Sequence, residues 1–130
     1  MSYDKEIIEL MISKAEEKLR SANTNLNNEQ YDDSASRSYY AVYHSICAVL
    51  TTKGLEFSSH GQTLGTFNRE FIKTEIFNKK YSKWIQSLFV LRESGDYDIR
   101  SDIDRKKAEG ALAMASELVK VIKEYLNKME

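Results

Sequence analysis

The chain has 130 residues, of which 42% are hydrophobic and 30% charged, a balance that suits one folded domain spanning residues 1–130. The chain has 19 Lys and Arg and 20 Asp and Glu, so its net charge is -1. A protein that covers nucleic acid over a broad surface needs an excess of basic residues, so this class is disfavoured, whereas a local basic pocket is compatible with the charge. Residues 1–6 lack the apolar core of a signal peptide and no apolar run reaches the roughly 20 residues that cross a bilayer, so we expect a cytoplasmic protein with no membrane partner.

The spacing of apolar residues predicts helices from the N-terminus onward. The chain has no proline and five glycines, so few residues interrupt a helix. Apolar residues recur at steps of three and four over about 3–25, and a second helix is expected over about 31–53. The second helix is rich in tyrosine and alanine and is apolar around most of its circumference. Such a helix is either central in a bundle or buried a second time at a dimer interface, and we therefore expect a homodimer.

Capping residues mark the starts of the next two helices. Ser59 followed by Gln62 is the pattern of a capping box, which predicts a third helix beginning there. Asn78 is a suitable cap for a fourth helix. On this fourth helix the apolar spacing assigns Trp84 and Leu88 to the buried face.

A polar segment separates the fourth helix from the last one. Gly95 and the acidic residues after it are expected to end or bend the fourth helix, and 99–104 reads as a loop. Apolar residues then recur at helical spacing over about 104–128. The sequence therefore predicts an all-α protein, an up-and-down bundle of four to five helices.

The first candidate functional residues lie on the second helix. Arg37 and His44 are seven residues apart, which places them on one helical face about 10 Å apart along the axis. Asp33 precedes Arg37 by one turn, and Tyr40 lies between the arginine and the histidine. The two side chains are spaced to converge on one small polar group. The alternative is a paired charge and a histidine that only packs.

The second group of candidates lies at the ends of helices. Arg92 prolongs the apolar face of the fourth helix, where an arginine needs a carboxylate, a phosphate or an aromatic ring as partner. Asp96 and Tyr97 follow it closely, so a charge-paired helix end is the alternative interpretation. His60 begins the third helix, where it either helps to hold a phosphate or is an exposed loop residue. With two histidines and a single Cys47 in no metal-ligand spacing, we expect no metal and no cofactor.

Several segments together resemble one known family, the HEPN domain family, and within it the small stand-alone prokaryotic branch. The resemblance runs from about residue 31 to the C-terminus and is carried by SRSYYAVYH at 36–44, GLEFSSHG at 54–61, FNREF at 67–71 and LRESGDYD at 91–98. It implies a helical bundle that pairs as a homodimer. It also implies either a metal-independent endoribonuclease, often a toxin neutralised by a small nucleotidyltransferase partner, or a non-catalytic member that binds nucleotide or supports that partner.

The resemblance also implies where the site lies. The usual family site is an arginine followed, after four to six residues, by a histidine, and it is doubled across the dimer interface. Arg37 and His44 satisfy this spacing, whereas the late position of the family motif matches Arg92, which is followed after four residues by Tyr97. The expected site for RNA or a nucleotide is therefore one polar cleft. Its catalytic candidates are Arg92, Tyr97, Arg37 and His44. Its supporting or phosphate-binding candidates are Asp96, Tyr40 and His60.

Overall fold

The structure is a computed structural model in which residues 4–129 are described, and within this range every regular element is a helix. The prediction of an all-α bundle is therefore confirmed. The elements are α1 (Lys5–Asn27), α2 (Tyr31–Thr51), α3 (His60–Phe67), the single π-helical turn η1 (Asn68–Ile72), α4 (Lys80–Tyr97) and α5 (Arg105–Lys128).

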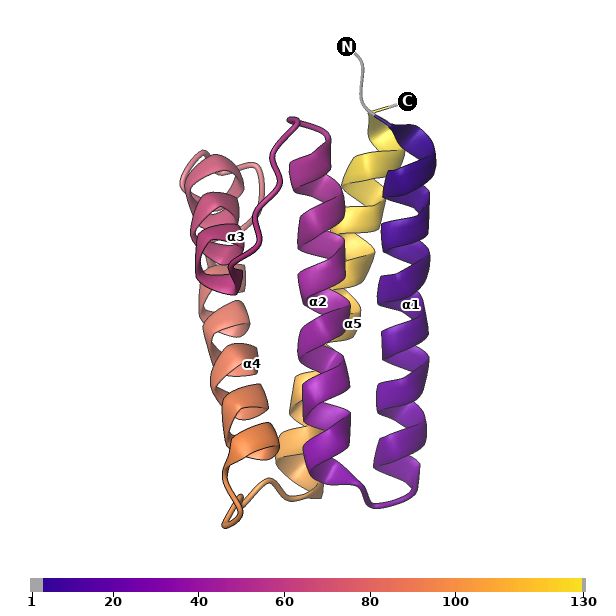
Figure 1. Cartoon of the computed structure of the whole chain (residues 1–130), viewed down its shortest axis with the longest axis vertical. Coiled ribbons are helices and arrows are strands. Elements are labelled where there is room, and N and C mark those ends of the chain that lie inside the picture. The colour runs from indigo at the N-terminus through magenta and orange to yellow at the C-terminus, as the bar shows by residue number, and fades with distance from the viewer. Residues whose placement is uncertain (1–3, 130) are drawn as a thin grey trace.

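Helix α2 occupies the centre of the bundle. The long helices α1, α2, α4 and α5 run alternately down and up, and the short α3 lies on the same side of α2 as α4 (Figure 1). Helix α2 packs against α1, α4 and α5, and also against α3. Its buried residues lie on opposite sides of the helix: Tyr39 belongs to the main core cluster, and Ala41, about 200° further round the helix, packs in a second cluster with Ala15 and Val119. The apolar circumference of α2 is thus covered within one chain. Of the two alternatives that the sequence left open, a central helix and a helix also buried at a dimer interface, the structure shows the first.

Side-chain caps begin two helices where the sequence places them. The Ser59 hydroxyl oxygen accepts a hydrogen bond from the Gln62 backbone N–H at 3.3 Å, which confirms the start of α3. An Asp104 carboxylate oxygen accepts from the Lys107 N–H at 2.9 Å at the start of α5. Each bond satisfies a donor that has no partner inside its helix.

The cap of α5 leads to a stability prediction. Replacing Asp104 with alanine should lower the free energy of unfolding by about 1 kcal/mol, because the Lys107 N–H then loses its acceptor. Urea denaturation followed by circular dichroism measures the change. Asp104→Asn is the matched control, since the amide oxygen can still accept the bond, and an equal loss in both variants would contradict the capping role.

Helix α4 ends close to the beginning of α2. The N-cap residue of α4 is Lys79, and the side-chain oxygen of Asn78 just before it accepts from the Lys80 N–H at 2.9 Å; the helix continues through Gly95 to Tyr97. A Cβ added at Gly95 would lie 3.2 Å from the Asp32 carbonyl oxygen. The glycine therefore allows α4 to approach the α2 backbone closely at the end where Arg92 lies.

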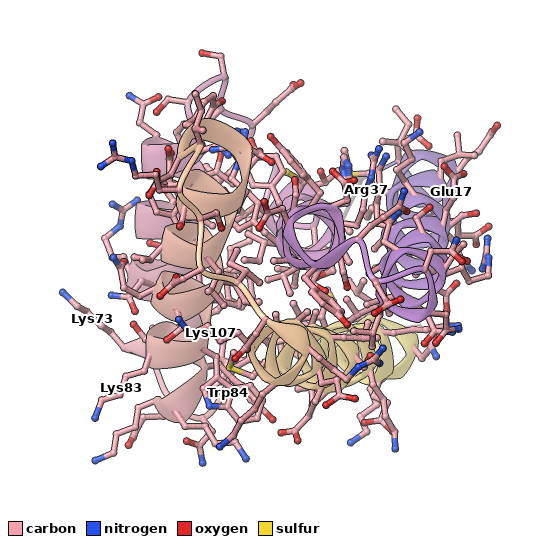
Figure 2. The ribbon with its side chains drawn as sticks, turned by 90° about the horizontal axis from the view of Figure 1, so that it is seen from below. Glu17, Arg37, Lys73, Lys83, Trp84 and Lys107 are labelled. Carbon is pink, nitrogen blue, oxygen red and sulfur yellow. The ribbon has the colours of Figure 1, made fainter. Side chains whose placement is uncertain are left out.

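The inner face of α4 differs from the predicted one at a single residue. Leu88 is fully buried as expected, and Tyr81 and Ile85 are also buried. Trp84, expected in the core, is only partly buried: it packs against the core cluster from the rim of the bundle, with its ring centroid 5.2 Å from that of Tyr81 and 5.0 Å from Lys80 Nζ (Figure 2). Neighbouring helical residues are separated by 100°, so Trp84 lies on the flank when Ile85 points inward.

Candidate functional site

Arg92 forms the centre of a polar and aromatic cluster where α4 packs against α2. Its side chain is 12% exposed, and its Nη2 donates to the Tyr40 hydroxyl at 2.7 Å and to the Tyr97 hydroxyl at 3.4 Å. Its Nη1 lies 3.2 Å from a Glu93 carboxylate oxygen. Its Nε lies 3.1 Å from Asp96 Oδ2 but has no aligned hydrogen bond, so this second pair is held by charge rather than by a directed bond.

Aromatic rings surround the same guanidinium group. Arg92 Cζ lies 5.6 Å from the Tyr39 ring centroid, 5.3 Å from that of Tyr40 and 5.4 Å from that of Tyr97. These distances are typical of cation–π contacts. Burial by itself would lower the pKa of Arg92, but Tyr40, Tyr97 and Asp96 raise the pKa overall. The guanidinium therefore stays charged in a pocket that is mostly aromatic.

His60 reaches this cluster from the beginning of α3. Its Nδ1 lies 2.6 Å from the Tyr39 hydroxyl oxygen, and its ring stacks on Tyr43 with centroids 4.1 Å apart. It also meets the Tyr40 ring edge-on at 5.9 Å. Burial and then the charge of Arg92 lower the pKa of His60. We call the group formed by Tyr39, Tyr40, Tyr43, His60, Arg92, Asp96 and Tyr97 the Arg92 cluster.

Two further contacts join the Arg92 cluster to the rest of the bundle. The Ser36 hydroxyl donates to Asp96 Oδ2 at 3.3 Å, which links the end of α4 to α2. The Tyr97 side chain lies at the open side of the cluster and is 69% exposed. The cluster is therefore anchored on α2 and accessible from the end of α4.

Arg37 lies away from the Arg92 cluster. It is exposed and lines a shallow depression with Glu17, Arg20 and other residues of α1 (Figure 2). The expectation that Arg37 and Arg92 line one cleft is not met within the chain, because α1 and α4 pack on different sides of α2 and Arg37 faces α1. The carboxylate of Asp96 pairs with Arg92 as expected, whereas no ion pair joins Arg37 to Asp33 among residues 4–129.

His44 lies at the border between the Arg92 cluster and α1. Its ring centroid is 6.4 Å from that of Tyr40 and 6.1 Å from that of Tyr43. Burial, followed by the charges of Lys18 and Lys14 on α1, lowers the pKa of His44. His44 thus shares the α1-facing side with Arg37 while touching the aromatic edge of the cluster.

The lowered pKa of His44 leads to a pH-dependence prediction. The folded protein binds a proton at His44 less readily than the unfolded chain does, so stability contributed by the neutral imidazole is lost as pH falls below its ordinary value of 6.5. Between about pH 7.5 and 5, urea denaturation midpoints should fall less for His44→Gln than for the wild type. An identical fall in both proteins would contradict the burial of a neutral His44.

Two residues of the Arg92 cluster were not predicted from the sequence. Tyr39 and Tyr43 hold His60 through a hydrogen bond and a ring stack, yet neither was a candidate. Their spacing of four residues does indicate a shared helical face. Their partner, His60, is 17 residues after Tyr43 and reaches them only through the fold.

Within residues 4–129, no group of three or more His, Cys, Asp or Glu side chains is placed to hold a metal ion. In the same range, no helix is long and apolar enough to cross a membrane.

The HEPN domain model matches residues 8–125, nearly the whole chain. The chain belongs to the HEPN domain family. The match confirms the resemblance seen in the sequence and extends it to α1, which the recognised segments did not include.

Several proteins are similar to this HEPN domain over almost their full length. A "UPF0332 protein" of Thermotoga maritima is 35% identical, over 95% of this chain and 98% of that protein. "Putative toxin MJ0142" of Methanocaldococcus jannaschii is 32% identical, over 97% of this chain and 85% of that protein. Among solved structures, TT1696 from Thermus thermophilus has a TM-score of 0.77 at 15% identity, covering 90% of this chain and 96% of that one, which shows a shared fold.

Proposed function

We propose that this HEPN domain is a toxin-like, metal-independent endoribonuclease in which Arg92 binds the phosphate that is cleaved. The observation that supports the proposal is the guanidinium of Arg92, which is charged, nearly buried and held among hydroxyl groups and aromatic rings. An arginine fork matches phosphate oxygens as well as it matches carboxylates. The similarity to a protein of M. jannaschii that carries "toxin" in its name also supports the toxin-like part of the proposal.

The proposed reaction uses the RNA itself as the nucleophile. A 2′-hydroxyl attacks the adjacent phosphorus, and Arg92 stabilises the additional negative charge that develops on the phosphate oxygens. The phosphate competes with Asp96 and Glu93 for the guanidinium, and the exposed hydroxyl of Tyr97 lies beside the entering group. The reaction also needs a proton carrier, and the two histidines, His44 and His60, both lie within contact of the tyrosines of the cluster.

A direct experiment tests this function. Purified protein is incubated with single-stranded RNA in the presence of a chelator, and the ends of the products are analysed. We expect fragments with 2′,3′-cyclic phosphate and 5′-hydroxyl ends, because the 2′-oxygen is the nucleophile. Intact RNA at protein excess, in a preparation that is folded by circular dichroism, would contradict the ribonuclease proposal.

A non-catalytic role is the second candidate, and one observation favours it. Tyr97 stands where the family motif has a histidine, and the charge of Arg92 is already paired with Asp96 and Glu93. Under this proposal the Arg92 cluster binds a nucleotide or supports a nucleotidyltransferase partner without cleaving RNA. Fluorescence anisotropy that detects binding of RNA or nucleotide without cleavage would favour this role over the first.

The proposed assembly is a homodimer in the cytoplasm. Because α2 is covered within the chain, the dimer rests on the family resemblance and on apolar residues exposed along and after α4, namely Val90, Tyr97 and Ile99. Light scattering at micromolar concentration should give about twice the 15.0 kDa mass of the chain. A monomer mass under the same conditions would contradict the dimer.

A nucleotidyltransferase partner is also proposed, on the resemblance alone. Co-expression with a small nucleotidyltransferase encoded next to this protein should relieve growth inhibition by the toxin-like chain. The control is the same partner expressed with the Arg92→Ala variant, where no inhibition is expected. Unchanged growth inhibition in the presence of the partner would contradict the pairing.

A further inference from the structure

Arg92 and His60 lie against the same two tyrosine rings, although they come from different helices. Arg92 Cζ lies 5.6 Å from the Tyr39 centroid, and the His60 ring lies 5.7 Å from it. For Tyr40 the corresponding distances are 5.3 and 5.9 Å. A guanidinium and an imidazole therefore both contact the rings of Tyr39 and Tyr40, and the charge of Arg92 acts on His60.

The orientation of the His60 ring is set by α2. The Tyr39 hydroxyl, 2.6 Å from Nδ1, engages one ring nitrogen, and the Tyr43 ring stacks on the imidazole at an interplanar angle of 17°. Tyr39 is 1% exposed, and burial raises its pKa far above the usual range, so its hydroxyl stays neutral. With Nδ1 engaged, Nε2 is the ring nitrogen left for a ligand, and no hydrogen bond to it occurs within residues 4–129.

We propose that His60 supplies the catalytic histidine of this site. Its Nε2 faces the phosphate bound by Arg92 and carries the proton, in place of the histidine that the family motif has after its arginine and that is Tyr97 here. The catalytic part of this assignment rests on the proposed ribonuclease function, whereas the placement of His60 beside the bound phosphate does not. Tyr39 is a positioning residue, since it acts through the Nδ1 of His60.

The proposed step is balanced by solvent. The 2′-oxygen forms a bond to phosphorus while its proton moves to Nε2 of His60, and the bond between phosphorus and the 5′-oxygen breaks. The departing 5′-oxygen takes a proton from water, and imidazolium returns its proton to solvent. The step requires the imidazole tautomer in which Nδ1–H donates to the Tyr39 oxygen, because this tautomer leaves Nε2 free to accept.

The charges around His60 suit a base that is neutral at rest. On α4, Arg92 lowers the pKa of His60 and Glu93 opposes it, with burial as the largest cause of the lowered value. The groups that face it from α2 are Tyr39, Tyr40, Tyr43 and His44. A phosphate on Arg92 places negative charge beside the ring and should raise its pKa.

His44 fits the same role less well. No hydrogen bond orients its ring among the described residues, and its nearest charged neighbours include Lys14 and Lys18 of α1 rather than Arg92. Its spacing partner, Arg37, lies on the α1 side, apart from the Arg92 cluster. His44, which follows Arg37 at the spacing of the family motif, is therefore not the histidine that lies beside Arg92.

Nuclear magnetic resonance tests the placement without any need for catalysis. The two histidine Cε1 proton signals, assigned with His44→Gln and His60→Gln, are titrated with pH in the absence and presence of uridine 3′-monophosphate. We expect the nucleotide to raise the pKa of His60 more than that of His44, and Arg92→Gln to abolish the effect. A rise confined to His44, or no rise at either histidine, would overturn the placement.

Cleavage kinetics test the catalytic role. His60→Gln should lose about 10²–10⁴-fold in rate while keeping its affinity for RNA, and His44→Gln should lose much less. Tyr39→Phe should change the shape of the pH–rate profile, which a purely structural tyrosine would leave unchanged. Full activity in His60→Gln would overturn the catalytic assignment, whereas a wild type that shows the His60 shift without cleaving RNA would contradict only the ribonuclease function.

Discussion

Replacing Arg92 with alanine should lower the rate of RNA cleavage by about 10²–10³-fold, the loss typical of removing one donor that stabilises a developing oxyanion. Arg92 is the one arginine or lysine in the cluster defined above, so no permanently charged side chain of the cluster can replace its guanidinium. Single-turnover cleavage of a short RNA, measured in chelator, gives the rate. Unchanged cleavage by Arg92→Ala would remove the basis of the proposed site.

Two further variants show whether the loss in Arg92→Ala comes from the charge of Arg92, from the geometry of its guanidinium, or from removing any positive charge. Arg92→Lys keeps the charge but loses the planar fork that bonds to Tyr40 and packs on the rings, so anion binding should weaken clearly rather than stay the same. Arg69→Ala is the matched control. Arg69 is 63% exposed and pairs with Glu70 on η1, away from the cluster, so cleavage should be unaffected. Equal losses in Arg69→Ala and Arg92→Ala would point to a non-specific effect of charge.

Replacing Leu88 with alanine should lower the free energy of unfolding by about 2–5 kcal/mol. Leu88 is fully buried in the core cluster that also holds Ile46 and Phe67, so truncation leaves a cavity that the surrounding helices fill only in part. The measurement is urea denaturation followed by circular dichroism, with a check that the slope of the transition is unchanged.

Trp84→Ala provides the comparison on the same helix. The ring of Trp84 is larger than the side chain of Leu88, but it lies at the rim and contacts Tyr81 and Lys80. We therefore expect a smaller destabilisation than for Leu88→Ala, although far more atoms are removed. A larger loss at Trp84 would show that the sequence-based assignment of the inner face was the better one.

The helices of this protein follow from local signals that short segments carry. Ser59 caps α3 as predicted, and Asn78 accepts from the Lys80 N–H one residue before the N-cap Lys79 of α4; such bonds can be predicted because the side chain acts on a backbone N–H only two or three residues away. The steps of three and four between apolar residues predicted the long helices for the same reason. The π-helical turn at Asn68–Ile72 was not predicted, since nothing in the pattern after Phe67 distinguishes it from a continued α-helix.

The candidate site was predicted in part. Arg92, Asp96 and Tyr97 lie within one and a half turns of each other, and the structure shows the contacts that this spacing favours. Tyr40 also reaches Arg92 as a supporting residue, at 2.7 Å, although 52 residues separate them. Within the chain Arg37 lies outside this cleft, because the period of a helix tells which residues share a face but not which neighbour that face meets.

The all-α class, the approximate helix boundaries and the need of Arg92 for partners inside the bundle could be predicted from the chain, because they depend on residues close together in it. The central place of α2, the side on which Arg37 lies and the contact of His60 with Tyr39 and Tyr43 became known from the folded structure. An apolar helix face can pack against any apolar partner of suitable shape, so the packing of all helices together selects which faces meet.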